Sequence, residues 1–142
     1  MMQYLQRNKY LETTVQTATP AQLLLMLFDG AIRFCRGAID ALRAKRNEEA
    51  NELLIKTQNI ISEFIITVDR NSPLAQSLLS LYEYYNHLLV QANIKKDVEP
   101  AEEVLGYLVE MKATWIEAAK AANATGAIPN GTANRTAQTV VG

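Results

Sequence analysis

The sequence predicts an all-α protein: an antiparallel four-helix bundle with a short N-terminal docking segment and a disordered C-terminal tail. Four long segments repeat apolar residues at three- and four-residue spacing, the period of a helix face, and no segment alternates as a half-buried strand would. The links between these segments are only a few residues long, and links this short make neighbouring helices antiparallel. Together these two observations predict an up-down-up-down bundle.

Start and stop signals place each helix. Thr19 is a good N-cap, Pro20 suits the first helical position, and Gln22 completes a capping box for the first helix. Prolines or acidic residues mark the later starts, and basic residues follow the first three helices, where they complement the helix dipole. The expected helices cover residues 20 to about 45, 47 to about 70, 72 to about 94 and about 97 to 122.

Composition excludes several functional classes. Lys and Arg number 14 against 15 Asp and Glu, so the net charge of -1 lacks the basic footprint of a nucleic-acid-binding protein. One cysteine, Cys35, and one histidine, His87, predict neither an intrachain disulfide nor a metal site. The chain shows no phosphate loop, no pairing of a nucleophile with a base and no paired inward carboxylates, so we expect no catalytic residues, no cofactor and no enzyme.

The N-terminus has no apolar stretch of the kind found in a signal peptide, and the run from Leu23 to Phe28 is far shorter than a membrane span. We therefore expect a cytoplasmic protein without membrane insertion. Residues 1–18 carry scattered apolar anchors and are interpreted as an N-terminal flap segment that could dock on the bundle. Residues 19–122 form the bundle domain, and residues 123–142 are small and polar, which predicts a disordered tail.

The helices carry more apolar surface than one bundle core needs. In the second helix the expected core stripe leaves Ile55 and Ile66 pointing outward, eleven residues or about three turns apart. In the third helix Leu79 and Val90 point outward at the same separation. The expected core stripe of the third helix is Leu74, Leu78, Leu81, Tyr85, Leu88 and Ala92.

The first helix has two apolar stripes. The first is Leu23, Leu27, Ala31, Phe34, Ala38 and Ala41, and the second is Leu25, Phe28, Ile32, Cys35 and Ile39. The N-terminal segment, a second copy of the chain, or amphipathic helices of a partner could cover this surplus. The alternative is that the first helix is simply central and contacts the three other helices. Gly30 and Gly37, seven residues apart, predict a close approach of another helix.

Several blocks of the sequence resemble the flagellar secretion chaperone family, FliS. They are VQTATP at 15–20, MLFDGA at 26–31, KTQNII at 56–61, LYEY at 81–84, LVQANIKKD at 89–97, EEV at 102–104, and Trp115. These blocks occur in the order and spacing of that family from about residue 10 to about residue 120.

The resemblance implies a cytoplasmic helical bundle that binds the disordered C-terminal segment of flagellin. Such a chaperone keeps flagellin from polymerising early and aids its delivery to the flagellar type III export apparatus, where a gate protein is a further possible partner. The resemblance also implies a displaceable N-terminal flap. We predict the flap residues as Tyr10, Leu11 and Leu5. The predicted partner-binding groove is lined by Ile55, Ile66, Leu79, Val90, Tyr82, Leu25, Phe28 and Ile32.

The alternative interpretation is a structural helical bundle that forms a homodimer or a larger homo-oligomer. In that case the second apolar stripe of the first helix would be the interface between copies. The tyrosine cluster at Tyr82, Tyr84 and Tyr85 is open to two interpretations, as core and rim packing or as a contact with a partner.

Overall fold

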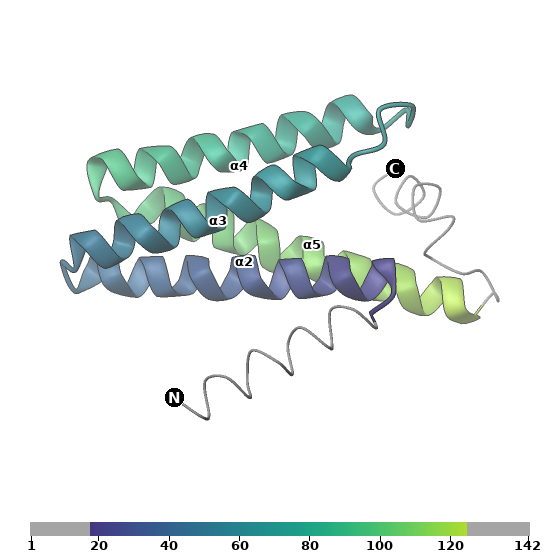
Figure 1. Ribbon diagram of the computed structural model, residues 1–142, viewed down its shortest axis with the longest axis horizontal. Coiled ribbons are helices and arrows are strands. Elements are labelled where there is room, and N and C mark those ends of the chain that lie inside the picture. The colour runs from purple at the N-terminus through teal and green to yellow at the C-terminus, as the bar shows by residue number, and fades with distance from the viewer. Residues whose placement is uncertain (1–17, 125–142) are drawn as a thin grey trace.

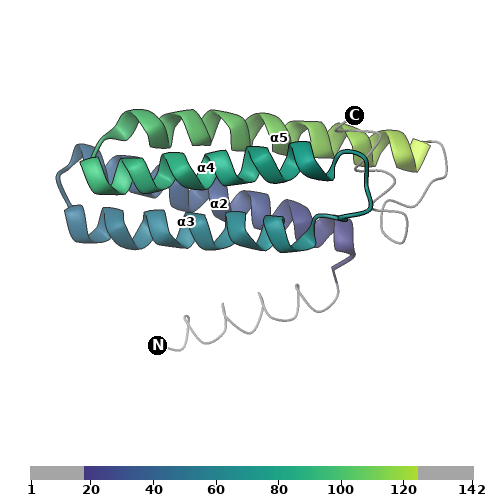
Figure 2. The ribbon, with the colours of Figure 1, turned by 90° about the horizontal axis from the view of Figure 1, so that it is seen from above.

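The computed structural model describes residues 18–124, and all regular structure in this range is α-helical. The helices are α2 (Pro20–Arg43), α3 (Asn47–Thr67), α4 (Ala75–Lys95) and α5 (Val98–Ala124). They run up and down as an elongated bundle, with the α2–α3 and α4–α5 links at one end and the α3–α4 link at the other (Figures 1 and 2). The C-terminal end of α5 extends beyond the other three helices (Figure 1). The predicted fold class is confirmed for this range.

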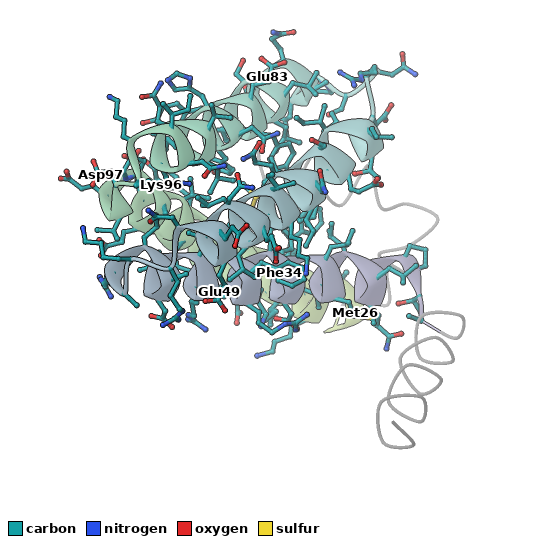
Figure 3. The ribbon with its side chains drawn as sticks, turned by 60° about the vertical axis from the view of Figure 1, so that its left-hand side comes forward. Met26, Phe34, Glu49, Glu83, Lys96 and Asp97 are labelled. Atoms are coloured by element: carbon teal, nitrogen blue, oxygen red, sulfur yellow. The ribbon has the colours of Figure 1, made fainter. Side chains whose placement is uncertain are left out.

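The helix starts follow their local sequence. The Thr19 hydroxyl accepts from the Gln22 backbone N–H at 3.1 Å, and the Gln22 side chain accepts from the Thr19 N–H at 2.9 Å. The predicted capping box is therefore present. Helices α2 and α4 are each followed by a lysine in the left-handed region, Lys45 at φ 62° and Lys96 at φ 51°. Lys96 and Asp97 lie where α4 turns into α5 (Figure 3), and the Asp97 N–H reaches back to the Ala92 carbonyl.

Two predicted boundaries differ from the structure. Helix α3 ends at Thr67 rather than near Arg70, but the Arg70 guanidinium still donates to the Ile65 carbonyl in the last turn of α3. Helix α4 begins at Ala75 rather than at Ser72. The Ser72 hydroxyl accepts from the Leu74 N–H at 3.1 Å, so this serine closes a turn before the helix instead of capping it.

Each helix packs mainly on two neighbours, in the cyclic order α2, α3, α4, α5. Helix α2 lies between α3 and α5, and both of its apolar stripes are largely buried: Phe28, Ala31, Cys35, Ala38 and Ala41 have no exposed surface. The second stripe of α2 is therefore core, although α2 packs mainly on two helices and not on the three that the central-helix alternative predicted. Added Cβ atoms at Gly30 and Gly37 would lie only 3.2 and 3.1 Å from Ile60 and Leu53 of α3, which confirms the predicted close approach.

The centre of the core is a chain of aromatic rings that joins all four helices. Phe28 of α2 lies 4.7 Å from Phe64 of α3, measured between ring centroids, and Phe64 lies 5.5 Å from Tyr82 of α4. Tyr82 contacts Tyr85 at 6.1 Å, and the Tyr85 ring stacks on Tyr107 of α5 at 5.2 Å. These distances are in the range of favourable aromatic pairs.

The rotation of α4 differs from the prediction. Its buried residues are Ala75, Leu78, Tyr82, Tyr85, Leu89 and Ala92. Leu81, expected in the core, is 39% exposed, and Leu88 is half-buried. The helix is turned so that Tyr82 enters the aromatic chain, where a large flat side chain fills the space between Phe64 and Tyr85.

Candidate protein-binding surface

The outer side of the α3–α4 pair carries polar contacts that fix the register of the two helices. Asn93 donates from its side-chain amide to the Asn51 side-chain oxygen at 2.7 Å, and Asn86 donates to the Ser62 hydroxyl at 3.4 Å. Because α3 and α4 are antiparallel, these two pairs mark two levels along one seam. Residues one turn away on the same face of each helix must lie along this seam as well.

The four outward apolar residues fall on this seam. Ile55 follows Asn51 by one turn and Val90 follows Asn86 by one turn, so both lie between the two polar pairs. Ile66 follows Ser62 by one turn and Leu79 precedes Asn86 by two, so both lie nearer the α3–α4 link. We call Ile55, Ile66, Leu79 and Val90 the α3–α4 surface.

The side chains of this surface are open to a partner. Ile66 is 69% exposed, Ile55 is 43% exposed and Val90 is 38% exposed, while Leu79 is half-buried. Side chains of this kind gathered along one seam are typical of a protein-binding site, since single exposed apolar residues would otherwise be scattered. Asn86 Oδ1, in the same seam, is buried and has no hydrogen-bond partner among residues 18–124.

Three residues predicted to line the groove lie in the core instead. Phe28 has no exposed surface, Tyr82 is 4% exposed and Ile32 is 7% exposed. Phe28 and Tyr82 both pack on Phe64, and Ile32 belongs to the same buried cluster. The prediction that these side chains face an open groove is corrected by their burial between neighbouring helices.

Leu25 is half-buried and lies away from the α3–α4 surface. It stands one turn before Asp29, whose carboxylate pairs with Lys112 of α5, so Leu25 lies on the α5 side of α2. The structure therefore does not bring all eight predicted groove residues together. The predicted flap residues Tyr10, Leu11 and Leu5 lie outside the described residues, as does the predicted tail after residue 124.

Sequence analysis missed other exposed apolar side chains. Leu81 and Ile94 on α4 and Val109 on α5 are each between 39% and 73% exposed. Tyr84, for which packing and a contact with a partner were both left open, is 43% exposed. A correct rotation of α4 would have identified Leu81, because the burial of Tyr82 and Leu89 turns Leu81 outward. Tyr84 also makes a polar contact, because its hydroxyl donates to the Glu103 carboxylate of α5 at 2.7 Å.

Cys35 lies in the core between α2 and α5 and not on the α3–α4 surface. Burial raises the pKa of the Cys35 thiol from 9.0 to about 12, and the thiol donates to the Ala101 carbonyl in the core. Within residues 18–124, no three His, Cys, Asp or Glu side chains are grouped so that they could hold a metal ion. None of the four helices is both long and apolar enough to cross a membrane.

Comparison with known proteins identifies the family. The model of the family described as flagellar protein FliS matches residues 1–122. The chain belongs to the FliS family. It is 43% identical to the flagellar secretion chaperone FliS of Bacillus subtilis (strain 168) over 109 residues, which cover 77% of this chain and 82% of the relative.

More distant FliS proteins match over a similar range. The flagellar secretion chaperone FliS of Salmonella typhimurium is 34% identical, with 73% of this chain and 79% of the relative covered. That of Campylobacter jejuni is 29% identical, with 82% of this chain and 93% of the relative covered. The resemblance inferred from the sequence blocks is confirmed, and the matched relatives of this FliS-family chain are flagellar secretion chaperones.

Proposed function

We propose that this chain is a cytoplasmic export chaperone that binds the disordered C-terminal segment of flagellin on the α3–α4 surface. By covering that segment it prevents early polymerisation and aids delivery to the flagellar type III export apparatus. Residues 1–18, with Tyr10, Leu11 and Leu5, act as a flap that covers part of the same surface and gives way to flagellin. Membership of the FliS family supports the chaperone role.

The observation that carries the proposed site is the exposure of apolar side chains in register along one helix pair. Ile66 and Leu79 lie at one level of the seam, and Ile55 and Val90 lie at another. An amphipathic helix places apolar residues on one face at three- and four-residue spacing, so it can contact both levels at once. A client segment that is disordered when free would gain helical structure by docking here.

The homo-oligomeric alternative loses its interface. It required the second stripe of α2 to be available to another copy, yet Phe28, Ile32, Cys35 and Ile39 are all at most 7% exposed within the single chain. We therefore do not propose that stripe as a self-interface.

The test is a calorimetric titration of the full chain with the C-terminal flagellin segment of the same organism. We expect a saturable complex near one-to-one with a negative heat-capacity change, the mark of apolar burial. In Ile66→Asp the affinity should fall about tenfold or more, since burying an isoleucine side chain contributes about 1.5–3 kcal/mol. The variant should remain folded, with its free energy of unfolding lowered by no more than about 1 kcal/mol, because this side chain is 69% exposed.

The matched control is Val109→Asp, which places the same charge on an exposed apolar position of α5, outside the α3–α4 surface. It should bind flagellin as the unmodified chain does. Wild-type affinity in a folded Ile66→Asp protein would exclude the α3–α4 surface as the site. No heat and no co-elution with the unmodified chain would exclude flagellin as the client.

A further inference from the structure

A pocket on the α4–α5 side of the bundle has a different chemistry from the α3–α4 surface. Its volume is about 210 Å³, and its lining residues are Tyr85, Tyr107, Glu110, Met111, Thr114 and Trp115. Tyr85 is buried and forms the floor, whereas Tyr107 and Trp115 are half-buried and Glu110 and Thr114 are exposed. Helices α4 and α5 lie side by side along this part of the bundle (Figure 2). The pocket therefore offers aromatic faces to solvent beside a carboxylate.

A second carboxylate lies at the edge of this pocket. Glu103 stands one turn before Tyr107, and its Oε2 accepts from the hydroxyls of Tyr84 at 2.7 Å and Tyr107 at 2.8 Å. These two donors favour the ionised form and hold the pKa of Glu103 below its usual range. The bonds also fix the Tyr107 ring, which stacks on Tyr85 with 19° between the ring planes. The aromatic wall is thus held in place before any ligand arrives.

Within residues 18–124, no basic side chain neutralises the negative charge of this site. Among residues 18–124, neither Glu103 nor Glu110 forms an ion pair, and no lysine or arginine lines the pocket. The contrast within the molecule is Phe34 of α2 (Figure 3), whose ring is flanked by the chain's own Arg33 at 5.2 Å and Lys56 at 5.5 Å. The rings of the α4–α5 pocket have no such cation in the described part of the chain.

We propose that the α4–α5 pocket is a docking site for an arginine side chain presented by a segment of a partner protein. A guanidinium group is flat, so it stacks on Trp and Tyr faces while its N–H groups donate to carboxylates. Trp115 and Tyr107 supply the faces, and Glu110 supplies a carboxylate that accepts. Aromatic residues and arginine are also the residues that most often dominate protein interfaces. This site lies on another seam of the bundle than the α3–α4 surface and does not depend on the identity of the client there.

Trp115 makes the proposal directly testable, because it is the only tryptophan of the 142-residue chain. The full chain is titrated with N-acetyl-arginine methylamide while the Trp115 fluorescence is recorded at constant ionic strength. The matched control ligand is the citrulline compound, which has the same shape without the charge. We expect a saturable change with arginine and none with citrulline. Equal responses to the two ligands, or a response to arginine that does not saturate, would overturn the proposal.

A pair of variants separates a specific contact from general charge attraction. Glu110→Gln should weaken arginine binding about two- to fivefold, the range for one exposed charge pair. Glu52→Gln removes the same charge from an exposed position of α3 and should leave the affinity unchanged. Equal weakening in both variants would show that only net charge matters and would overturn the site. Unchanged unfolding midpoints in both variants establish that the comparison is made between folded proteins.

Discussion

Cys35 illustrates how position in the fold sets the chemistry of a single side chain. The thiol has no exposed surface, donates to the Ala101 carbonyl at 3.4 Å, and has its pKa raised by burial to about 12. The same cause raises the pKa of Tyr85 to about 12 and moves that of Tyr82 in the same direction. Each of these groups is neutral when protonated, so the folded core retains protons that the unfolded chain releases at lower pH.

This retention predicts a loss of stability at alkaline pH. Above pH 9 the unfolded chain loses the Cys35 proton first, so the unfolded state binds fewer protons and the free energy of unfolding falls as pH rises. The slope should approach about 1 kcal/mol per pH unit, and the loss continues toward the folded-state pKa near 12. Urea unfolding between pH 9 and 10 measures the total slope, to which Tyr82 and Tyr85 also contribute as they begin to ionise in the unfolded chain. The comparison with a variant that lacks the thiol isolates the contribution of Cys35.

The control for this prediction is Cys35→Ala. That variant is less stable at neutral pH because it leaves a small cavity, but its stability should change less steeply between pH 9 and 10. Identical slopes for the two proteins would show that the thiol is not responsible.

At the scale of the helix, the space around a glycine shows how closely that face of the helix approaches its neighbour. A Cβ atom at Gly37 of α2 would lie 3.1 Å from Leu53 of α3, whereas at Gly106 of α5 nothing lies within 4 Å. Gly106 is also exposed. Gly37 therefore permits the close approach of α2 and α3, whereas Gly106 has no such packing role.

We predict that replacing glycine by alanine affects stability differently at these two positions. Gly106→Ala should raise the free energy of unfolding by about 0.5–1 kcal/mol, because alanine favours the helix and meets no neighbour. Gly37→Ala should raise the free energy of unfolding by less than Gly106→Ala does, or should lower it, because the Leu53 side chain must move. Denaturant midpoints at unchanged slope measure both. A larger gain at Gly37 than at Gly106 would contradict this account of the α2–α3 contact.

At the scale of the whole molecule, the aromatic chain holds the four helices to one another. Phe64 is its link between α2 and α4, with ring centroids 4.7 Å from Phe28 and 5.5 Å from Tyr82. The ion pairs between α2 and α5, Arg43 with Glu102 and Asp29 with Lys112, lie at partly exposed positions. Exposed pairs contribute only about 0–1 kcal/mol each, so the apolar core provides most of the stability.

We predict that two positions in α3, only two residues apart, differ sharply in their effect on stability. Phe64→Ala should lower the free energy of unfolding by about 3–5 kcal/mol, because it removes a fully buried ring and leaves a cavity. Ile66→Asp should lower it by no more than about 1 kcal/mol, because the side chain faces solvent and only the unfavourable placement of an acid in the last turn of α3 costs stability. Chemical denaturation monitored by circular dichroism compares them, and a similar cost at both sites would refute the division into core and surface.

Local sequence predicted the helices well because their ends depend on nearby residues. Thr19 and Gln22 specify the start of α2 through hydrogen bonds that span only three residues, and Pro20 suits the first helical position. The α3–α4 link was harder, because Ser72 serves a turn before α4 as readily as it would serve a helix cap. The outward positions of Ile55, Ile66 and Val90 were also predictable, since the stripe opposite them in each helix was apolar enough to be the core.

The sequence by itself determined the all-α class, the four helices, the FliS-family blocks and most of the α3–α4 surface. Only the tertiary structure decided that both stripes of α2 are buried, that α4 is turned to bury Tyr82, and that Phe28 and Ile32 belong to the core. The physical reason is that periodicity defines which residues share a helix face, a local property. Which neighbour covers that face depends on how the helices are arranged around one another, and in this bundle α2 has α3 on one side and α5 on the other.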